Sequence, residues 1–217
     1  MTQNGDLGQG ERIDRLLSGA RVMPVVVIED EGCAVAMADA LAEGGVRTLE
    51  ITLRTPAALA AVERIARERP EIVVGTGTVL CERDLADSRA AGARFAVSPG
   101  LTPALAEAAG RHADCPLLPG TATASEVMAA LEAGFTRLKF FPAETSGGAK
   151  AVAALAGPLP AARFCPTGGI KPDTAQRYLD LGNVFCVGGS WLTPKQALRD
   201  QDWPALTELA RQASGQS

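Results

Sequence analysis

A lysine in the middle of a short apolar run is the strongest chemical signal in this 217-residue sequence. The run Arg-Leu-Lys-Phe-Phe-Pro at 137–142 follows Gly134 and has the length and aromatic content of a buried strand. An ammonium group is among the groups that leave water least readily, so Lys139 needs a reason to be there. It can extend to the surface or pair with a carboxylate. Alternatively, burial lowers the pKa of a lysine, and the neutral amine is a nucleophile toward carbonyl carbons.

Composition and charge limit the classes of function. Hydrophobic residues make up 47% and charged residues 21% of the chain, which is enough for a packed core. The net charge is −4, so we expect no binding to nucleic acid. No apolar run approaches the roughly 20 residues of a membrane span. Residues 1–10 are polar and lack the apolar segment of a signal peptide, so we expect a flexible tail there and a cytoplasmic protein.

Cysteines and histidine offer no metal-binding pattern. The five cysteines are odd in number and form no C-x-x-C pair, which favours a reduced, cytoplasmic protein. The single histidine, His112, follows a predicted helix in a polar patch, and we interpret it as a surface side chain rather than a catalytic one. Because zinc sites draw on clusters of His and Cys, we expect a mechanism without metal or cofactor.

Apolar runs alternate with alanine-rich stretches along the whole chain, which predicts eight strand–helix units. The strands are expected over residues 23–28, 48–53, 72–76, 95–98, 117–118, 137–141, 163–165 and 184–187. The helices are expected over residues 11–17, 34–43, 56–69, 83–91, 103–110, 125–133, 149–156, 172–181, 194–199 and 203–212. Threonine–proline pairs at Thr55, Thr102 and Thr193 predict three helix starts, each with a threonine N-cap.

Such an alternation, with no break in composition, predicts parallel strands joined by right-handed crossovers. Eight units close naturally into a barrel, so we predict an α/β fold, a compact single-domain (β/α)₈ TIM barrel over residues 11–217 with an N-terminal helix. An open, doubly wound sheet is the alternative. It is disfavoured because no G-x-G-x-x-G motif follows the first strand.

The alternation of side chains along a strand places several polar residues inside this barrel. In the second strand Glu50 and Arg54 have inward parity, and in the sixth Lys139 and Phe141 share it. Active sites of such barrels lie where the strands end, so parity predicts a carboxylate, a guanidinium and an amine in one cavity. A Glu50–Lys139 ion pair could also simply fill space. The cost of desolvating a buried pair can exceed its attraction, which makes that an inefficient way to build a core.

Two glycine-rich turns are predicted after the last two strands, Thr167-Gly168-Gly169 and Gly188-Gly189-Ser190. Glycines let backbone N–H groups approach an anion, and the N-terminus of a following helix adds positive potential. The loops after strands seven and eight are also the recurrent phosphate site of this fold. The two turns therefore favour a phosphorylated ligand, although a single Gly-Gly pair more often marks only a tight turn.

Six motifs together resemble the 2-keto-3-deoxy-6-phosphogluconate (KDPG) aldolase family of class I aldolases. They are LEITLRT at 49–55, GTGTV at 75–79, SPG at 98–100, KFFPAE at 139–144, CPTGGI at 165–170 and GGSW at 188–191. The motifs run in family order across nearly the full chain, and none departs from the family pattern. The resemblance therefore covers the whole predicted barrel.

The resemblance implies cleavage of KDPG to pyruvate and glyceraldehyde 3-phosphate, through a Schiff base on Lys139 with Glu50 as the acid and base. It implies binding of the pyruvyl carboxylate by Arg54, Thr78, Pro99 and Phe141. It implies phosphate binding by Thr167, Gly168, Gly169, Gly189 and Ser190. It also implies a homotrimer without cofactor or metal, whose partner is a small phosphorylated keto acid.

Two other classes of function share part of the pattern. A phosphosugar isomerase or decarboxylase on the same barrel would use the phosphate loops but would need no inward lysine. A non-catalytic sensor of phosphorylated ligands would bind without turnover. Within the aldolase interpretation, the gluconate substrate, its galactonate epimer and the unphosphorylated 4-hydroxy-2-oxoglutarate all stay open.

Overall fold

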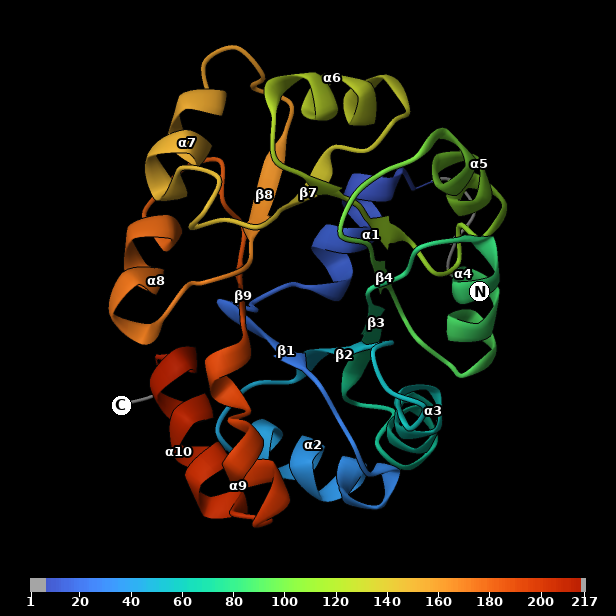
Figure 1. The fold of residues 1–217 in the computed structure, drawn as a ribbon, viewed down its shortest axis with the longest axis vertical. Coiled ribbons are helices and arrows are strands. Elements are labelled where there is room, and N and C mark those ends of the chain that lie inside the picture. The colour runs from blue at the N-terminus through green and yellow to red at the C-terminus, as the bar shows by residue number, and fades with distance from the viewer. Residues whose placement is uncertain (1–6, 216–217) are drawn as a thin grey trace.

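A ring of parallel strands surrounded by helices forms the molecule, in a computed structural model that describes residues 7–215 (Figure 1). The strands are β1 (Val22–Val26), β2 (Thr48–Thr52), β3 (Val73–Gly77), β4 (Ala96–Val97), β5 (Leu117–Leu118), β6 (Gly120–Thr121), β7 (Arg137–Phe140), β8 (Arg163–Pro166) and β9 (Val187–Gly189). The helices are α1 (Gln9–Leu16), α2 (Ala34–Glu43), α3 (Ala58–Glu68), α4 (Glu82–Ala90), α5 (Pro103–Arg111), α6 (Ala124–Glu132), α7 (Gly148–Leu155), α8 (Pro172–Leu179), α9 (Lys195–Arg199) and α10 (Trp203–Ser214). Short 3₁₀ helices, η1 (Glu31–Cys33) and η2 (Ser190–Leu192), precede α2 and follow β9.

The ring closes through two irregular joints. One set of strands runs in the order β5-β4-β3-β2-β1-β9 and the other β6-β7-β8, all in parallel pairs. β5 and β6 are two pieces of one chain path separated by Pro119, which has no N–H to give to a ladder. Single bridges, Phe164 to Val184 and Thr167 to Gly188, connect the paths of β8 and β9. The predicted (β/α)₈ barrel is confirmed.

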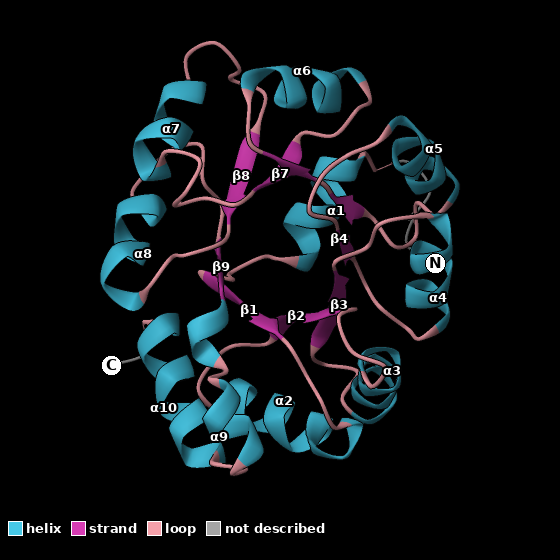
Figure 2. Cartoon of the chain, in the orientation of Figure 1, coloured by secondary structure: helices cyan, strands magenta, loops and turns pink. Residues whose placement is uncertain are grey.

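Helix α1 covers the end of the barrel at which the strands begin, and it appears in the middle of the strand ring in the axial view of Figure 2. Its Ile13 is fully buried among the inward side chains of the barrel. Asp14 accepts a hydrogen bond of 2.7 Å from Arg137, the first residue of β7. The expected N-terminal helix is therefore present and already includes Gln9. Residues 1–6 of the expected tail lie outside the described residues.

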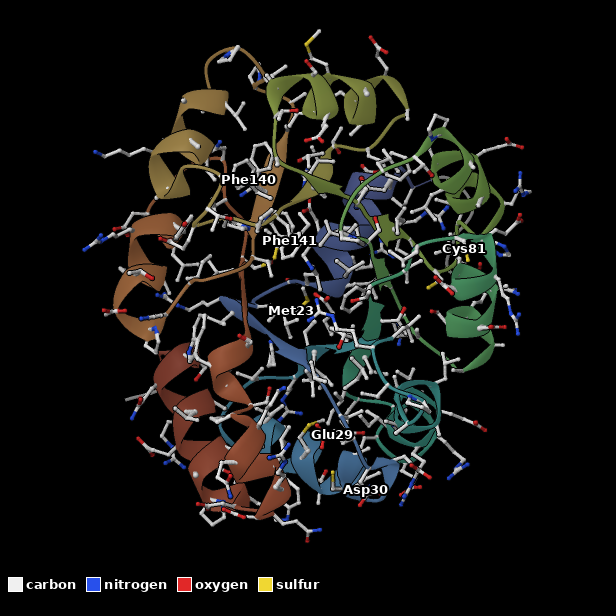
Figure 3. All side chains as sticks on the ribbon, in the orientation of Figure 1. Met23, Glu29, Asp30, Cys81, Phe140 and Phe141 are labelled. Atoms are coloured by element: carbon white, nitrogen blue, oxygen red, sulfur yellow. The ribbon has the colours of Figure 1, made fainter. Side chains whose placement is uncertain are left out.

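Strand side chains divide between two apolar clusters, as their parity predicts. Leu49, Ile51, Leu138 and Phe140 pack in the cluster between strands and helices. A second, smaller cluster fills the ring itself around Met23 and the buried face of α1. Figure 3 shows Phe140 on the helical side of β7 and Phe141 toward the centre of the ring. This alternation fixes which side chains can reach an internal site.

Two of the three predicted threonine N-caps are wrong. Only Thr102 accepts a hydrogen bond from a helical N–H, that of Leu105 in α5, at 3.2 Å. Thr55 instead donates to the carbonyl of Ile28 at 2.5 Å, and α3 begins three residues later. Thr193 precedes Pro194, which is itself the N-cap of α9. Thr55 therefore serves the loop, and the hydroxyl of Thr193 is buried with no hydrogen-bond partner among the described residues, which the local Thr-Pro pattern does not reveal.

The last strand is also displaced from its predicted position. Val187–Gly189 forms β9, so the glycines of the expected second turn lie in a strand paired with β1. A Cβ at Gly188 would lie 2.2 Å from Thr167 Oγ1, and one at Gly189 would lie 2.4 Å from the Trp191 ring. These glycines permit close packing inside a strand, so the predicted turn at 188–190 is wrong for Gly188 and Gly189.

Candidate active site

A buried ion pair lies in the centre of the barrel. Lys139 on β7 places its Nζ 3.4 Å from Oε1 of Glu50 on β2, and the two side chains are 5% and 1% exposed. The ring centroid of Phe141 lies 5.1 Å from the same nitrogen. The other carboxylate oxygen of Glu50, Oε2, is buried and has no hydrogen-bond partner in the described part of the chain. The pair thus combines an amine with a carboxylate oxygen that is still available to a proton donor.

Gly77 provides the room for this carboxylate. It pairs with Thr52 on the neighbouring strand, and a Cβ at Gly77 would lie 2.0 Å from Glu50 Oε1. Any larger residue would therefore push Glu50 away from Lys139. Gly77 lies in the GTGTV motif at 75–79, but the motif alone does not indicate that this glycine makes room for Glu50.

Arg54 and Thr78 meet where β2 and β3 end. The Nε–H of Arg54 donates to Thr78 Oγ1 at 3.1 Å. Thr78 has a φ of 62°, a conformation that is rare for a β-branched residue and costs about 1–3 kcal/mol. Such strain persists where the surroundings enforce it, often at functional sites. Arg54 is exposed, and a guanidinium in this setting is suited to binding a carboxylate with two hydrogen bonds.

Pro99 follows β4 and lies beside Gly120 of β6, the residue that pairs with Lys139. A Cβ at Gly120 would lie 2.2 Å from the Pro99 carbonyl oxygen, and Gly120 pairs with Lys139 between β6 and β7. The structure therefore brings the candidate residues of β2, β3, β4 and β7 to the same end of the ring, at the carboxyl ends of the strands.

The turn after β8 has two consecutive residues in the left-handed region, Gly168 with φ 104° and Gly169 with φ 78°. Thr167 ties this turn to β9 through its bridge to Gly188, and Ser190 follows β9 as the exposed first residue of η2. The candidate phosphate residues thus lie on two adjacent segments, the turn after β8 and the end of β9 with the first residue of η2. Backbone N–H groups in such a turn, close to the N-terminus of α8, can bind an anion.

Two thiols accompany the pair inside the barrel. Cys165 pairs with Lys139 between β7 and β8, and it belongs with Cys186 to the cluster inside the ring. Burial, and then the neighbouring Cys165 and the Glu50 charge, raise the pKa of the Cys186 thiol well above its usual value. Cys186 therefore stays protonated and packs as a small apolar residue. The charged chemistry of the interior is concentrated in Glu50 and Lys139.

His112 and the acidic residues form no alternative centre within residues 7–215. There the His, Cys, Asp and Glu side chains make no group of three that could hold a metal ion. His112 lies at the end of α5, 3.9 Å from Glu82. No helix in the same range is long and apolar enough to cross a bilayer.

The fold and this site define a parallel (β/α)₈ barrel with a buried amine and carboxylate at its centre, and comparisons with known proteins give the family. Residues 13–209 match the KDPG and KHG aldolase family. The KHG/KDPG aldolase of Escherichia coli strain K12 is 50% identical over 200 residues, which is 92% of this chain and 93% of that protein. The chain therefore belongs to the KDPG and KHG aldolase family.

Solved structures agree in both fold and sequence. The KDPG aldolase of Legionella pneumophila, with pyruvate captured as a covalent carbinolamine intermediate, has a TM-score of 0.88 and 43% identity, covering 90% of this chain and 95% of that one. The KDPG aldolase of Zymomonas mobilis ZM4, with 3-phosphoglycerate, has a TM-score of 0.88 and 47% identity, covering 93% and 94%.

Proposed function

We propose that this chain is a class I aldolase that cleaves KDPG to pyruvate and glyceraldehyde 3-phosphate, and that it also acts on 4-hydroxy-2-oxoglutarate. The observation that carries the proposal is the buried contact between Lys139 Nζ and Glu50 at 3.4 Å. The carbinolamine that pyruvate forms with the Legionella relative supports an amine as the nucleophile. Relatives named for both substrates support the dual activity.

The chemistry follows from the two groups. Lys139 Nζ attacks the C2 carbonyl of the keto acid, and the carbinolamine loses water to give a protonated imine. Glu50 removes the proton of the C4 hydroxyl as the C3–C4 bond breaks, and the bond electrons enter the imine to form an enamine. The aldehyde product leaves. Protonation at C3 and hydrolysis of the imine then release pyruvate and restore the amine.

Different residues bind the carboxylate end and the phosphate end of the substrate. Arg54 and Thr78, already hydrogen-bonded to each other at 3.1 Å, bind the carboxylate next to the reacting carbonyl, where Pro99 and Phe141 form the apolar wall. The phosphate binds between the segments after β8 and β9, through Thr167, Gly168, Gly169, Gly189 and Ser190. The lysine then lies between an anchor for each end of the substrate.

The phosphate assignment predicts a loss that depends on the substrate. Ser190→Ala removes one hydroxyl donor, and Gly168→Ala places a side chain at a φ of 104°. We expect Ser190→Ala to lower kcat/KM for KDPG by about tenfold or more, the worth of one hydrogen bond to a charged group, and Gly168→Ala to lower it by displacing the turn. For 4-hydroxy-2-oxoglutarate, which has no phosphate, kcat/KM should change little. Equal losses on both substrates would show that these segments do not hold phosphate.

The rival enzymatic class explains less of the geometry. An isomerase or decarboxylase with the same phosphate loops has no need of an ammonium group buried against a carboxylate, an arrangement that costs stability. A sensor would need neither group. The Lys139–Glu50 contact therefore favours the aldolase.

Turnover after removal of metal ions tests the proposed function. KDPG, its galactonate epimer and 4-hydroxy-2-oxoglutarate should be assayed side by side with enzyme treated exhaustively with chelator. We expect cleavage of KDPG at the untreated rate, because the imine, rather than a metal ion, withdraws the electrons. Activity that disappears with chelator and returns with added zinc would contradict the proposal.

We also propose that the enzyme is a cytoplasmic homotrimer. The match over nearly the full length of the KDPG and KHG aldolases supports this assembly, and the five unpaired cysteines suit a reducing compartment. Sedimentation should give three times the chain mass of 22.4 kDa. A mass of one or two chains would contradict the trimer.

A further inference from the structure

A hydrogen bond between two side chains ties the loop after the lysine strand to the helix after the phosphate turn. The phenol of Tyr178 on α8 donates to Glu144 Oε1. Tyr178 is 1% exposed and is among the largest fully buried side chains of the protein, whereas Glu144 is exposed. An apolar core has no need of this phenol, because a phenylalanine would fill the same space. The hydroxyl is therefore the feature that requires an explanation.

The surroundings of Glu144 connect it directly to the phosphate turn. Its backbone N–H donates to the Gly168 carbonyl at 3.1 Å, and that of Ala143 donates to the Thr167 carbonyl at 2.8 Å. A Cβ at Gly169 would lie 2.9 Å from the Cβ of Glu144 and 3.0 Å from its Cγ. The side chain of Glu144 thus packs on the turn itself, and only its carboxylate reaches back to Tyr178.

The Tyr178–Glu144 contact connects the segment after Lys139 with the helix after the phosphate turn. Glu144 follows Lys139 by five residues, and Tyr178 is nine residues beyond Gly169 on the helix that the phosphate turn begins. Burial first, and then the bond to Glu144, raise the pKa of the phenol far above its usual value, so it is a permanent donor. A bond from a neutral donor to a carboxylate in a partly buried place is among the stronger hydrogen bonds.

We propose that Tyr178 and Glu144 are positioning residues, which fix the turn at Thr167–Gly169 relative to the loop that leaves the Schiff-base strand. Neither residue touches the reacting atoms. Their bond sets the distance between the phosphate anchor and Lys139, so that a phosphorylated substrate meets both together. The inference rests on the proposed function. The Tyr178–Glu144 bond would favour phosphorylated substrates, because a substrate without phosphate does not bind the turn at Thr167–Gly169.

The test compares kcat and KM for KDPG and for 4-hydroxy-2-oxoglutarate. Tyr178→Phe removes only the hydroxyl, and we expect KM for KDPG to rise about tenfold, with kcat within about twofold and the second substrate unaffected. Glu144→Ala should reproduce this change, whereas Glu144→Gln, which keeps an acceptor oxygen, should restore most of the affinity. The double variant Tyr178→Phe/Glu144→Ala should be no worse than either single variant, because both remove the same bond.

A matched control separates positioning from stability. Thr207→Val also removes a buried hydroxyl, which donates to the Ala40 carbonyl at 3.0 Å between α10 and α2 rather than to the loop or helix that flanks the turn. It should lower the melting temperature without changing either KM. Equal losses on both substrates, additive losses in the double variant, or a lower KM for KDPG in Glu144→Ala would each overturn the inference. A wild-type enzyme that cleaves neither substrate would instead contradict the proposed function.

Discussion

Lys139→Arg should abolish cleavage, lowering turnover by at least about 10⁴-fold, because it removes the nucleophile and keeps a positive charge. The retained charge matters, since Glu50 is 1% exposed and would otherwise be left as an unpaired buried carboxylate. Removing one member of a buried pair typically costs about 3–5 kcal/mol, which could be mistaken for a catalytic effect. A comparison of melting temperatures with the wild type separates the two.

Trapping with borohydride gives the same assignment by an independent route. Incubation of the wild type with pyruvate and borohydride should leave a reduced adduct on the peptide that contains Lys139 and none in Lys139→Arg. The other lysines of the chain, Lys150, Lys171 and Lys195, are all exposed and none faces a carboxylate inside the barrel. An adduct on one of those three would contradict the role of Lys139.

The barrel and the internal ion pair could be predicted because both follow from strand geometry. Alternation of strands and helices predicted the fold, and the two-residue period predicted that Glu50 and Lys139, on strands that are not neighbours, both point into the ring. The family resemblance implied that Arg54 and Thr78 hold the same carboxylate, and the structure shows the two side chains hydrogen-bonded to each other. These features depend on spacing within one strand, which a sequence displays directly.

The features that escaped prediction all depend on contacts between distant segments. Gly188 and Gly189 look like turn residues, but they lie in β9 because the side chains of Thr167 and Trp191 occupy the space of their missing Cβ atoms. Tyr178 looks like an ordinary core residue of an amphipathic helix, since its partner lies 34 positions away. Single-residue patterns carry no information on such partners.

Glu50→Gln should reduce turnover by about 10²–10⁴-fold with the fold intact, the usual range for loss of a general acid or base. Glutamine keeps the shape of the side chain and can still accept a hydrogen bond from Lys139 Nζ, which lies 3.4 Å from Glu50 Oε1. It removes the basicity that two steps need, loss of water from the carbinolamine and removal of the proton from the C4 hydroxyl. The melting temperature checks whether the uncompensated ammonium of Lys139 destabilises the barrel.

Exchange of the pyruvate methyl protons with solvent isolates the base from the rest of the reaction, because it needs the imine and a proton acceptor but no aldehyde. In Glu50→Gln this exchange should fall in parallel with cleavage, while borohydride trapping at long incubation still labels Lys139. The nearest rival on the loop after β7, Glu144, already accepts a hydrogen bond from Tyr178, which leaves it less suited to proton transfer. Glu50 is better suited to proton transfer, since its buried Oε2 has no hydrogen-bond partner within residues 7–215. Wild-type exchange in Glu50→Gln would therefore show that another base forms the imine and acts on the methyl protons, and would contradict Glu50 as the proton shuttle.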